Sequence, residues 1–156
     1  IGSGFRAADS VEATVRKRAK SVEGLEVRTY HQGMPLHLFY RAADLFVLTG
    51  MIEGEPTVLC EAMASGLPIV ANAIEGHCRL VNHLETGLLY EGDNPTSLKN
   101  ALNALIGDTA LCSRLGDNAR RLAVQERDIE VVAQRYLSLL KSDSQDRPLT
   151  NKAATT

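Results

Sequence analysis

The sequence predicts an α/β fold, in which helices cover both faces of a parallel β-sheet. Strand-like and helix-like patterns alternate from residue 1 to residue 90, and the pattern after residue 90 is helical only. Residues 44–48 and 68–71 form nearly continuous apolar runs, which are typical of parallel strands buried on both faces. The length of 156 residues is that of a single domain with a substantial core.

The first expected elements lie on either side of a polar helix. Ile1 is expected to end a buried strand, because the turn-forming run Gly2-Ser3-Gly4 follows it. Residues 9–20 are polar and contain no proline, and their few apolar residues recur at helical spacing, which predicts an exposed helix. Residues 25–30 alternate between apolar and polar side chains, as a strand with one covered face does.

Strands and helices continue to alternate through the middle of the chain. The elements expected here are helices over 36–43 and 57–65 and strands over 44–48, 68–71 and 87–90. Pro56 is placed in the first turn of the second of these helices and Gly66 just past its end, which is the usual asymmetry of helix boundaries. Ligands of such sheets bind at the carboxyl ends of the strands, so the loops that follow the strands are the candidate sites.

Three amphipathic helices are expected after residue 90. Their apolar faces are formed by Leu98, Leu102, Leu105 and Ile106; by Leu115, Ala119 and Leu122; and by Ile129, Val132, Ala133, Tyr136, Leu139 and Leu140. Residues 142–156 are mostly small and polar and show no periodicity. We therefore expect one domain over 1–141, truncated at its N-terminus, and a disordered tail over 142–156.

The composition excludes several classes of protein. The net charge is −2 and aromatic residues make up 4%, so the chain lacks the basic excess and the stacking side chains of a nucleic-acid-binding protein. Cys60, Cys78 and Cys112 are widely spaced, which argues against a disulfide framework or a zinc site and predicts reduced thiols in a cytoplasmic protein. No apolar run approaches the ~20 residues of a membrane span. The basic run 16–18 is expected on a solvated helix face.

The loop at 49–56 is the strongest candidate for a ligand site. It follows a buried strand and leads directly into a helix, and Gly50 and Gly54 allow its backbone to turn tightly and to approach a ligand. The free N–H groups and the positive dipole end of that helix favour an anion such as a phosphate. Glu61, one turn into the helix, can accept hydrogen bonds from the vicinal hydroxyls of a ribose. Glu53 is expected to lie near the chemical group that is attached to the other side of the phosphate.

The spacing of Glu53 and Glu61 is a weak signal by itself, and two solvated carboxylates are the alternative explanation. However, the run that contains both residues, EGEPTVLCEAMASGLPIVA at 53–71, resembles the signature of family-4 retaining glycosyltransferases with the GT-B fold. Further segments that resemble this family are LFYRAADLFVL at 38–48, ETGLLY at 85–90, LGDNARR at 115–121 and VAQRYL at 132–137. The resemblance extends from residue 1 to residue 141.

The resemblance implies a Rossmann-like half-domain that binds a nucleotide-sugar donor, with retention of the anomeric configuration on transfer. It implies that Glu61 binds the ribose hydroxyls and that Glu53, as the catalytic candidate, lies beside the donor sugar. The residues implied for the donor sugar and phosphates are Gly54, Glu55, Pro56, Thr57 and Val58, and those implied for the base are Arg28, Tyr30, His31 and Leu36. No metal or other cofactor is implied, and the chain has no Asp-x-Asp pair for a divalent ion.

The chain departs from the family pattern in two respects. Residues 74–81 have Glu75 and Arg79 where the family has glycine and glutamate, which puts this loop in doubt as a ligand loop. His77 in the same loop has no cysteine or carboxylate spaced for a metal or a triad, and we interpret it as an ordinary histidine. The family's first strand and loop, with an Arg/Lys pair for the diphosphate, and the acceptor-binding domain are expected upstream of Ile1. The isolated chain is therefore expected to bind a donor weakly and not to catalyse transfer.

These observations predict the donor-binding part of a glycosyltransferase that uses a UDP-, GDP- or ADP-sugar. The alternative is a non-catalytic nucleotide-sugar-binding subunit or module that needs a partner chain. A phospho-acceptor receiver domain ranks last, because its acidic cluster and lysine at the strand ends are missing. The expected partners are the nucleotide-sugar, an N-terminal acceptor-binding domain and, through a membrane-linked acceptor, the membrane surface.

Overall fold

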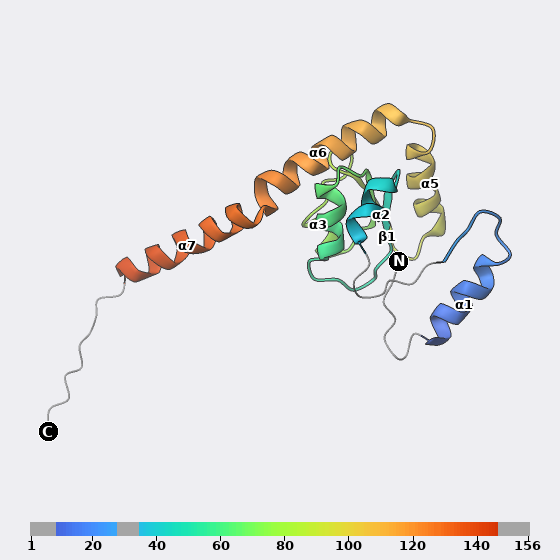
Figure 1. Cartoon of the computed structure of the whole chain (residues 1–156), viewed down its shortest axis with the longest axis horizontal. Helices are drawn as coiled ribbons and strands as arrows, with labels where there is room; N and C mark the ends of the chain where they lie inside the picture. Colours follow the sequence, from blue (N-terminus) through green and yellow to red (C-terminus); the bar gives the residue numbers. More distant parts are fainter. Residues whose placement is uncertain (1–8, 28–34, 147–156) are drawn as a thin grey trace, which may run out of the picture. The chain divides into compact units, whose positions relative to one another are not determined.

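The structure, a computed structural model, describes residues 9–27 and 35–146 (Figure 1). The chain divides into two compact units, residues 1–36 and 37–156. The first unit contains helix α1 (Asp9–Ala19), which confirms the helix predicted over 9–20. The basic side chains in its last turn are exposed, as predicted.

The strand predicted over 25–30 is not formed in the part that the structure describes. Residues 25–27 are irregular, and residues 28–30 lie outside the described residues, as does the predicted strand end at Ile1. A strand needs a neighbouring backbone with which it exchanges hydrogen bonds. The carbonyl oxygen of Val27 instead accepts a hydrogen bond from Nη1 of Arg16 at 3.1 Å, so a side chain takes the place that a strand neighbour would have.

The second unit is built around a parallel sheet, which confirms the predicted fold class. Its strands are β1 (Phe46–Leu48), β2 (Ile69–Asn72) and β3 (Leu88–Tyr90), in the order β1-β2-β3. Val47 is in register with Val70, and Ala71 with Leu89. Because all of the strands run in the same direction, their carboxyl ends and the loops that follow them lie along one edge of the sheet.

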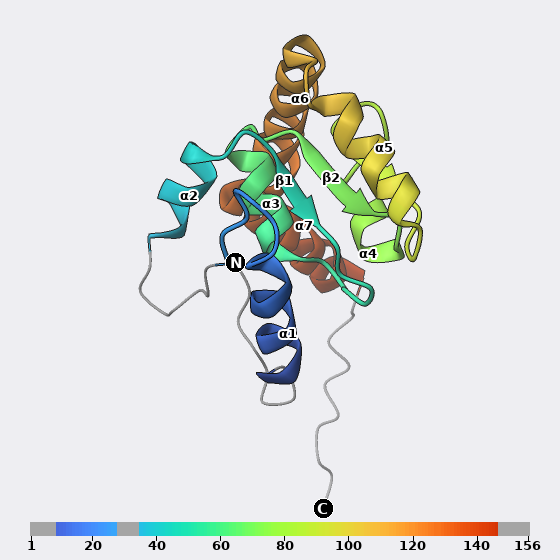
Figure 2. The same ribbon diagram turned by 90° about the vertical axis from the view of Figure 1, so that its right-hand side faces the viewer.

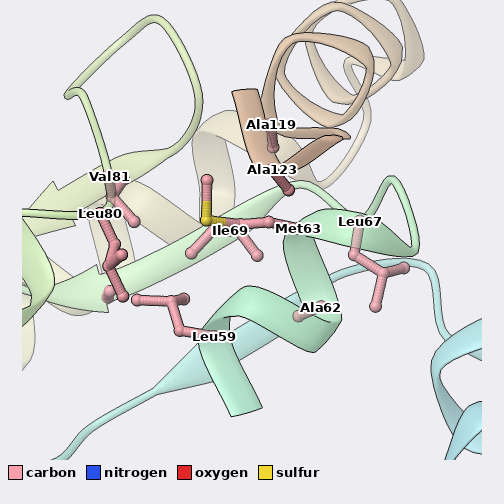
Figure 3. Close-up of a cluster of buried hydrophobic side chains, with 10 residues drawn as sticks. Leu59, Ala62, Met63, Leu67, Ile69, Leu80, Val81, Ala119 and Ala123 are labelled. Atoms are coloured by element: carbon pink, nitrogen blue, oxygen red, sulfur yellow. The ribbon is translucent and has the colours of Figure 1, made fainter. Parts of the chain in front are cut away.

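Helices cover both faces of this sheet (Figure 2). Helix α3 (Thr57–Ala64) and the second half of α6 (Thr109–Arg127) pack on the face that carries Ile69 and Ala71. Leu59, Met63 and Ile69 are fully buried there and converge on one another (Figure 3). Helix α5 (Pro95–Leu105) and the first half of α6 pack on the opposite face, around Val70. The alternation of buried residues along β2 is that of a strand covered on both sides.

Strand β1 is less buried than its continuous apolar sequence predicted. Val47 has 36% of its surface exposed, and Phe46 and Leu48 are only half-buried. The reason is its position, because β1 is an edge strand of the described sheet whereas β2 lies in the middle. The helices α5 and α6 pack over β2 and β3, so the face of the sheet that carries Val47 is left partly open.

Side-chain caps begin two of the remaining helices. Two further helices are short: α2 (Leu36–Ala42), before β1, and α4 (Glu75–Cys78), after β2. The side chain of Asn94 accepts a hydrogen bond from the Ser97 N–H at 3.0 Å and so caps α5. Asp108 caps α6 in the same way, by accepting from Leu111 at 2.8 Å. Ile106, predicted in the apolar face of α5, lies at the C-cap and is exposed.

The last helix, α7 (Ile129–Asp146), differs from the prediction at its end and on its apolar face. It continues through residues 142–146, which were predicted as a disordered tail, because this stretch contains neither glycine nor proline and a helix once formed propagates readily. Residues 147–156 of that tail lie outside the described residues. Most of the predicted apolar face is exposed, and Ile129 has 76% of its surface accessible, whereas Val132 is half-buried.

The three cysteines differ in exposure, which predicts an order of chemical modification. Cys78 is exposed, whereas Cys60 and Cys112 are half-buried, and burial raises the pKa of both of these thiols. Thiolate is the reactive form, so iodoacetamide at mildly alkaline pH is expected to alkylate Cys78 first. Peptide mass spectrometry over a pH series measures the three rates. Equal rates at all three positions would contradict the burial seen here.

Candidate functional site

The candidate ligand loop connects β1 to α3 along the carboxyl edge of the sheet. Its backbone is tied to the neighbouring strand, because Nδ2 of Asn72 at the end of β2 donates a hydrogen bond to the Gly50 carbonyl oxygen at 3.1 Å. The same nitrogen lies 3.3 Å from Sδ of Met51. Asn72 itself is almost completely buried, whereas its contact with the loop is part-buried. The end of β2 therefore fixes where the loop leaves β1.

The two glutamates of the predicted signature are both exposed but have different surroundings. The side chain of Glu53 folds back over Gly50, where an added methyl group would lie 3.0 Å from Cγ and 3.0 Å from Oε1. Glu61 lies on α3, and its Oε2 accepts a hydrogen bond from the Tyr40 hydroxyl at 2.8 Å. Glycine at position 50 therefore leaves room for Glu53, and a residue of another helix orients Glu61.

The N-terminus of α3 presents backbone N–H groups beside the loop. Pro56 is the N-cap residue with an extended backbone and makes no side-chain cap. Pro56 has no N–H and is buried, so it starts the helix but cannot donate to a ligand. Thr57 and Val58 follow at the first helical positions, whose N–H groups have no acceptor within the helix. A methyl group added at Gly54 would meet nothing within 4 Å, so the loop is open there.

Glu55 is held by the far end of α6. Its Oε1 forms an ion pair with Nη1 of Arg127 at 2.6 Å, across 72 residues of sequence. The side chain of Glu55 is thus occupied, and only its backbone is left for the ligand role that the sequence predicted. Sequence reasoning missed Arg127, because no local pattern links the two residues.

The segment after β2, predicted as a loop over 74–81, contains the short helix α4 and packs against the candidate ligand loop. A methyl group added at Gly76 would lie 2.2 Å from the carbonyl oxygen of Gly54 and 2.3 Å from that of Glu53. His77 is fully buried, and its Nδ1 lies 2.8 Å from the Asn72 carbonyl oxygen. Glu75 and Arg79, the residues that depart from the family pattern, form an exposed ion pair with each other. The departures therefore leave the close packing of α4 against the candidate loop intact.

Two buried polar atoms of this layer have no hydrogen-bond partner in the described part of the chain. They are Oδ1 of Asn72 and Nε2 of His77. A methyl group added at Gly92, in the loop after β3, would lie 2.8 Å from Oδ1 of Asn72, so backbone closes over the side chain. The end of β2 thus contacts the loops that follow all three described strands. The sequence signal that could have found this layer is a polar residue, Asn72, at the end of an apolar strand.

The residues predicted for the base cannot be compared with this geometry. Arg28, Tyr30 and His31 lie outside the described residues, and Leu36 is half-buried at the start of α2. Within 9–27 and 35–146, no group of three or more His, Cys, Asp or Glu side chains could hold a metal ion. The same ranges contain no helix long and apolar enough to cross a membrane. Donor binding without a metal stays a prediction.

A parallel sheet with helices on both faces, and a glycine-containing loop that leads into a helix at its carboxyl edge, define a Rossmann-like half-domain of the GT-B type. The crystal structure of Anabaena HepE with UDP superposes with a TM-score of 0.80 at 25% identity, over 88% of this chain and 38% of that one. Its complex with UDP-glucose gives a TM-score of 0.76 at 27% identity, over the same shares.

Sequence comparison gives the family. The family model described as "Glycosyl transferases group 1" matches residues 4–122, and the chain belongs to this family. An uncharacterized glycosyltransferase of Haemophilus influenzae is 34% identical over 103 residues, which are 65% of this chain and 29% of that protein. A D-inositol 3-phosphate glycosyltransferase of Salinispora arenicola is 37% identical over 91 residues, 58% of this chain and 20% of that protein. The matched part of the chain thus covers less than a third of the length of these relatives.

Proposed function

We propose that the second unit binds the nucleotide-sugar donor of a retaining, family-4 glycosyltransferase. The observation that carries the proposal is the arrangement at the start of α3, where free N–H groups at Thr57 and Val58 stand one turn from the exposed carboxylate of Glu61. A helix N-terminus favours a phosphate, and a carboxylate accepts hydrogen bonds from hydroxyl groups. A nucleoside diphosphate presents both groups, a few ångströms apart.

The loop supplies the remaining roles in this proposal. The backbone N–H groups of Gly54, Glu55, Thr57 and Val58 bind the diphosphate and donor sugar, and Glu61 binds the ribose hydroxyls. Glu53 lies by the donor sugar as the catalytic candidate, with Gly50 leaving space for its side chain. Arg28, Tyr30, His31 and Leu36 are proposed to contact the base. No metal ion is needed in this scheme, because helix amides hold the phosphates.

Of the three donor classes, a UDP-sugar is proposed in preference to a GDP- or ADP-sugar. The support is the likeness to Anabaena HepE, which has been crystallised with UDP and with UDP-glucose. Transfer also requires an acceptor site, and we propose that an acceptor-binding domain, on the same chain or on a partner chain, provides it. A non-catalytic donor-binding module would bind the nucleotide equally well, so a transfer assay with the acceptor-binding part added separates the two.

Substitution of Glu61 by alanine tests the proposal. Hydrogen bonds to a charged group are the strong ones, worth about 1.5–3 kcal/mol each, so Glu61→Ala is expected to weaken UDP binding at least about tenfold. The melting temperature of the 156-residue chain is followed during titrations with UDP, GDP and ADP. Glu130→Ala, which removes an exposed carboxylate from α7, is the matched control and should leave the affinity unchanged. If no nucleotide raises the melting temperature of the unsubstituted chain, the proposal is wrong.

A further inference from the structure

Tyr40 contacts the proposed ribose-binding residue but has no part in the proposed function so far. It lies on α2, and its ring packs against Phe46 with the ring centroids 6.0 Å apart and the planes tilted by 53°. Tyr40 is half-buried and adjoins the core cluster formed by α3 and the sheet. Packing therefore fixes the ring, and with it the position of the hydroxyl group.

The hydroxyl of Tyr40 contacts one oxygen of the Glu61 carboxylate, which is otherwise exposed. It donates to Oε2 of Glu61 at 2.8 Å, and no other described residue shares a hydrogen bond with the Glu61 carboxylate. Burial, and then the hydrogen bond and the charge of Glu61, raise the pKa of Tyr40. Tyr40 consequently stays a protonated donor through the neutral range. Oε1 and the second lone pair of Oε2 stay available, because an ionised carboxylate has about four acceptor positions.

A glutamate side chain loses considerable conformational entropy when it is held in one rotamer. If the side chain is free before binding, this entropy loss reduces the binding free energy of the ligand. Tyr40 removes part of this freedom before any ligand arrives, which is how preorganisation raises affinity. The fixed carboxylate then meets two hydroxyl groups in one orientation. A sugar that lacks one of these hydroxyls leaves a carboxylate lone pair without a partner, and such sites reject the incomplete ligand.

We propose that Tyr40 is a positioning residue, which holds the Glu61 carboxylate so that the site selects a ribonucleotide over a 2′-deoxyribonucleotide. This inference rests on the proposed donor-binding function. It adds a residue from α2, 21 positions before Glu61, to the determinants of donor specificity.

The test compares UDP with 2′-deoxy-UDP on the unsubstituted chain and on Tyr40→Phe, which keeps the ring and its contact with Phe46. The unsubstituted chain is expected to prefer UDP about tenfold. In Tyr40→Phe the dissociation constant for UDP is expected to rise about threefold to tenfold, while that for 2′-deoxy-UDP changes less, so the preference shrinks. The ratio of the two constants is a readout that loss of stability alone would not change. Tyr136→Phe on α7, where the tyrosine is exposed, is the matched control.

The outcomes separate this inference from the function on which it rests. If the unsubstituted chain binds neither nucleotide, both fail. If it binds UDP, and Tyr40→Phe binds UDP and 2′-deoxy-UDP with the same constants as the unsubstituted chain, only the role of Tyr40 is overturned. The role is also overturned if the affinities for both nucleotides fall by the same factor, because that result indicates a general disturbance of the site. A reduced preference in Tyr40→Phe, with Tyr136→Phe unchanged, supports it.

Discussion

Replacement of Gly76 by alanine is expected to weaken UDP binding about a hundredfold and to lower the free energy of unfolding. The new methyl carbon would lie 2.2 Å from the Gly54 carbonyl oxygen and 2.3 Å from that of Glu53. A carbon–oxygen contact needs about 3.3 Å, so the candidate loop must move by about 1 Å. Hydrogen bonds stretched by that distance are lost, and the loss of two charge-assisted bonds corresponds to about a hundredfold in affinity.

Gly54→Ala, in the loop against which α4 packs, is the control for the effect of Gly76→Ala on stability. A methyl group at Gly54 meets no atom within 4 Å, so this substitution should leave the fold unchanged. Overpacking typically lowers the free energy of unfolding by about 1–3 kcal/mol. A urea titration should therefore show a loss of stability in Gly76→Ala and none in Gly54→Ala. Titration of Gly76→Ala and of the unsubstituted chain with UDP by calorimetry measures the affinity. If Gly76→Ala binds UDP as tightly as the unsubstituted chain, helix α4 does not support the ligand loop.

The sequence predicted the second unit well wherever local signals mark an element. Pro56 and Gly66 bracket α3, and Gly66 has the positive φ of +78° that suits glycine past a helix end. The apolar run at 68–71 corresponds to β2, which is buried on both faces. These elements are set by patterns within a few residues, so they could be predicted without knowledge of their neighbours.

The predictions that were wrong depend on neighbours that no local pattern reveals. The apolar run at 44–48 indicated full burial, yet β1 is an edge strand of the described sheet and Val47 is partly exposed. The alternation at 25–30 indicated a strand, yet residues 25–27, the described part, are irregular and the carbonyl of Val27 accepts a hydrogen bond from the Arg16 side chain. The predicted end of α7 came too early in the sequence. The polar composition of residues 142–146 was interpreted as disorder, although these residues are compatible with a helix.

The candidate site was predicted in part, for the same reason. Glu53 and Glu61 could be identified because they lie in one continuous signature beside a strand end. Tyr40 and Arg127 could not, since their contacts with this loop and helix span 21 and 72 residues and depend on how α2 and α6 pack. The role of Asn72 also depends on the sheet, because its side chain bridges two loops that follow adjacent strands.

Replacement of Leu59 by alanine is expected to lower the free energy of unfolding by about 2–5 kcal/mol. Leu59 is fully buried between α3 and the sheet, beside Met63 and Ile69 (Figure 3). The truncation removes apolar surface from the core and leaves a cavity, because the backbones of α3 and β2 are held by their own hydrogen bonds and cannot close it. Urea unfolding followed by circular dichroism measures the change.

Val58→Ala is the matched control, because Val58 precedes Leu59 on the same helix but has 36% of its surface exposed. Its expected cost is below about 1 kcal/mol. The pair also separates stability from function, since Leu59 faces the core whereas Glu61, two residues further along α3, is exposed. The folded fraction of Leu59→Ala should therefore bind UDP with nearly unchanged affinity. A loss of affinity in that folded fraction would show that the position of Glu61 depends on core packing as well as on the hydrogen bond from Tyr40.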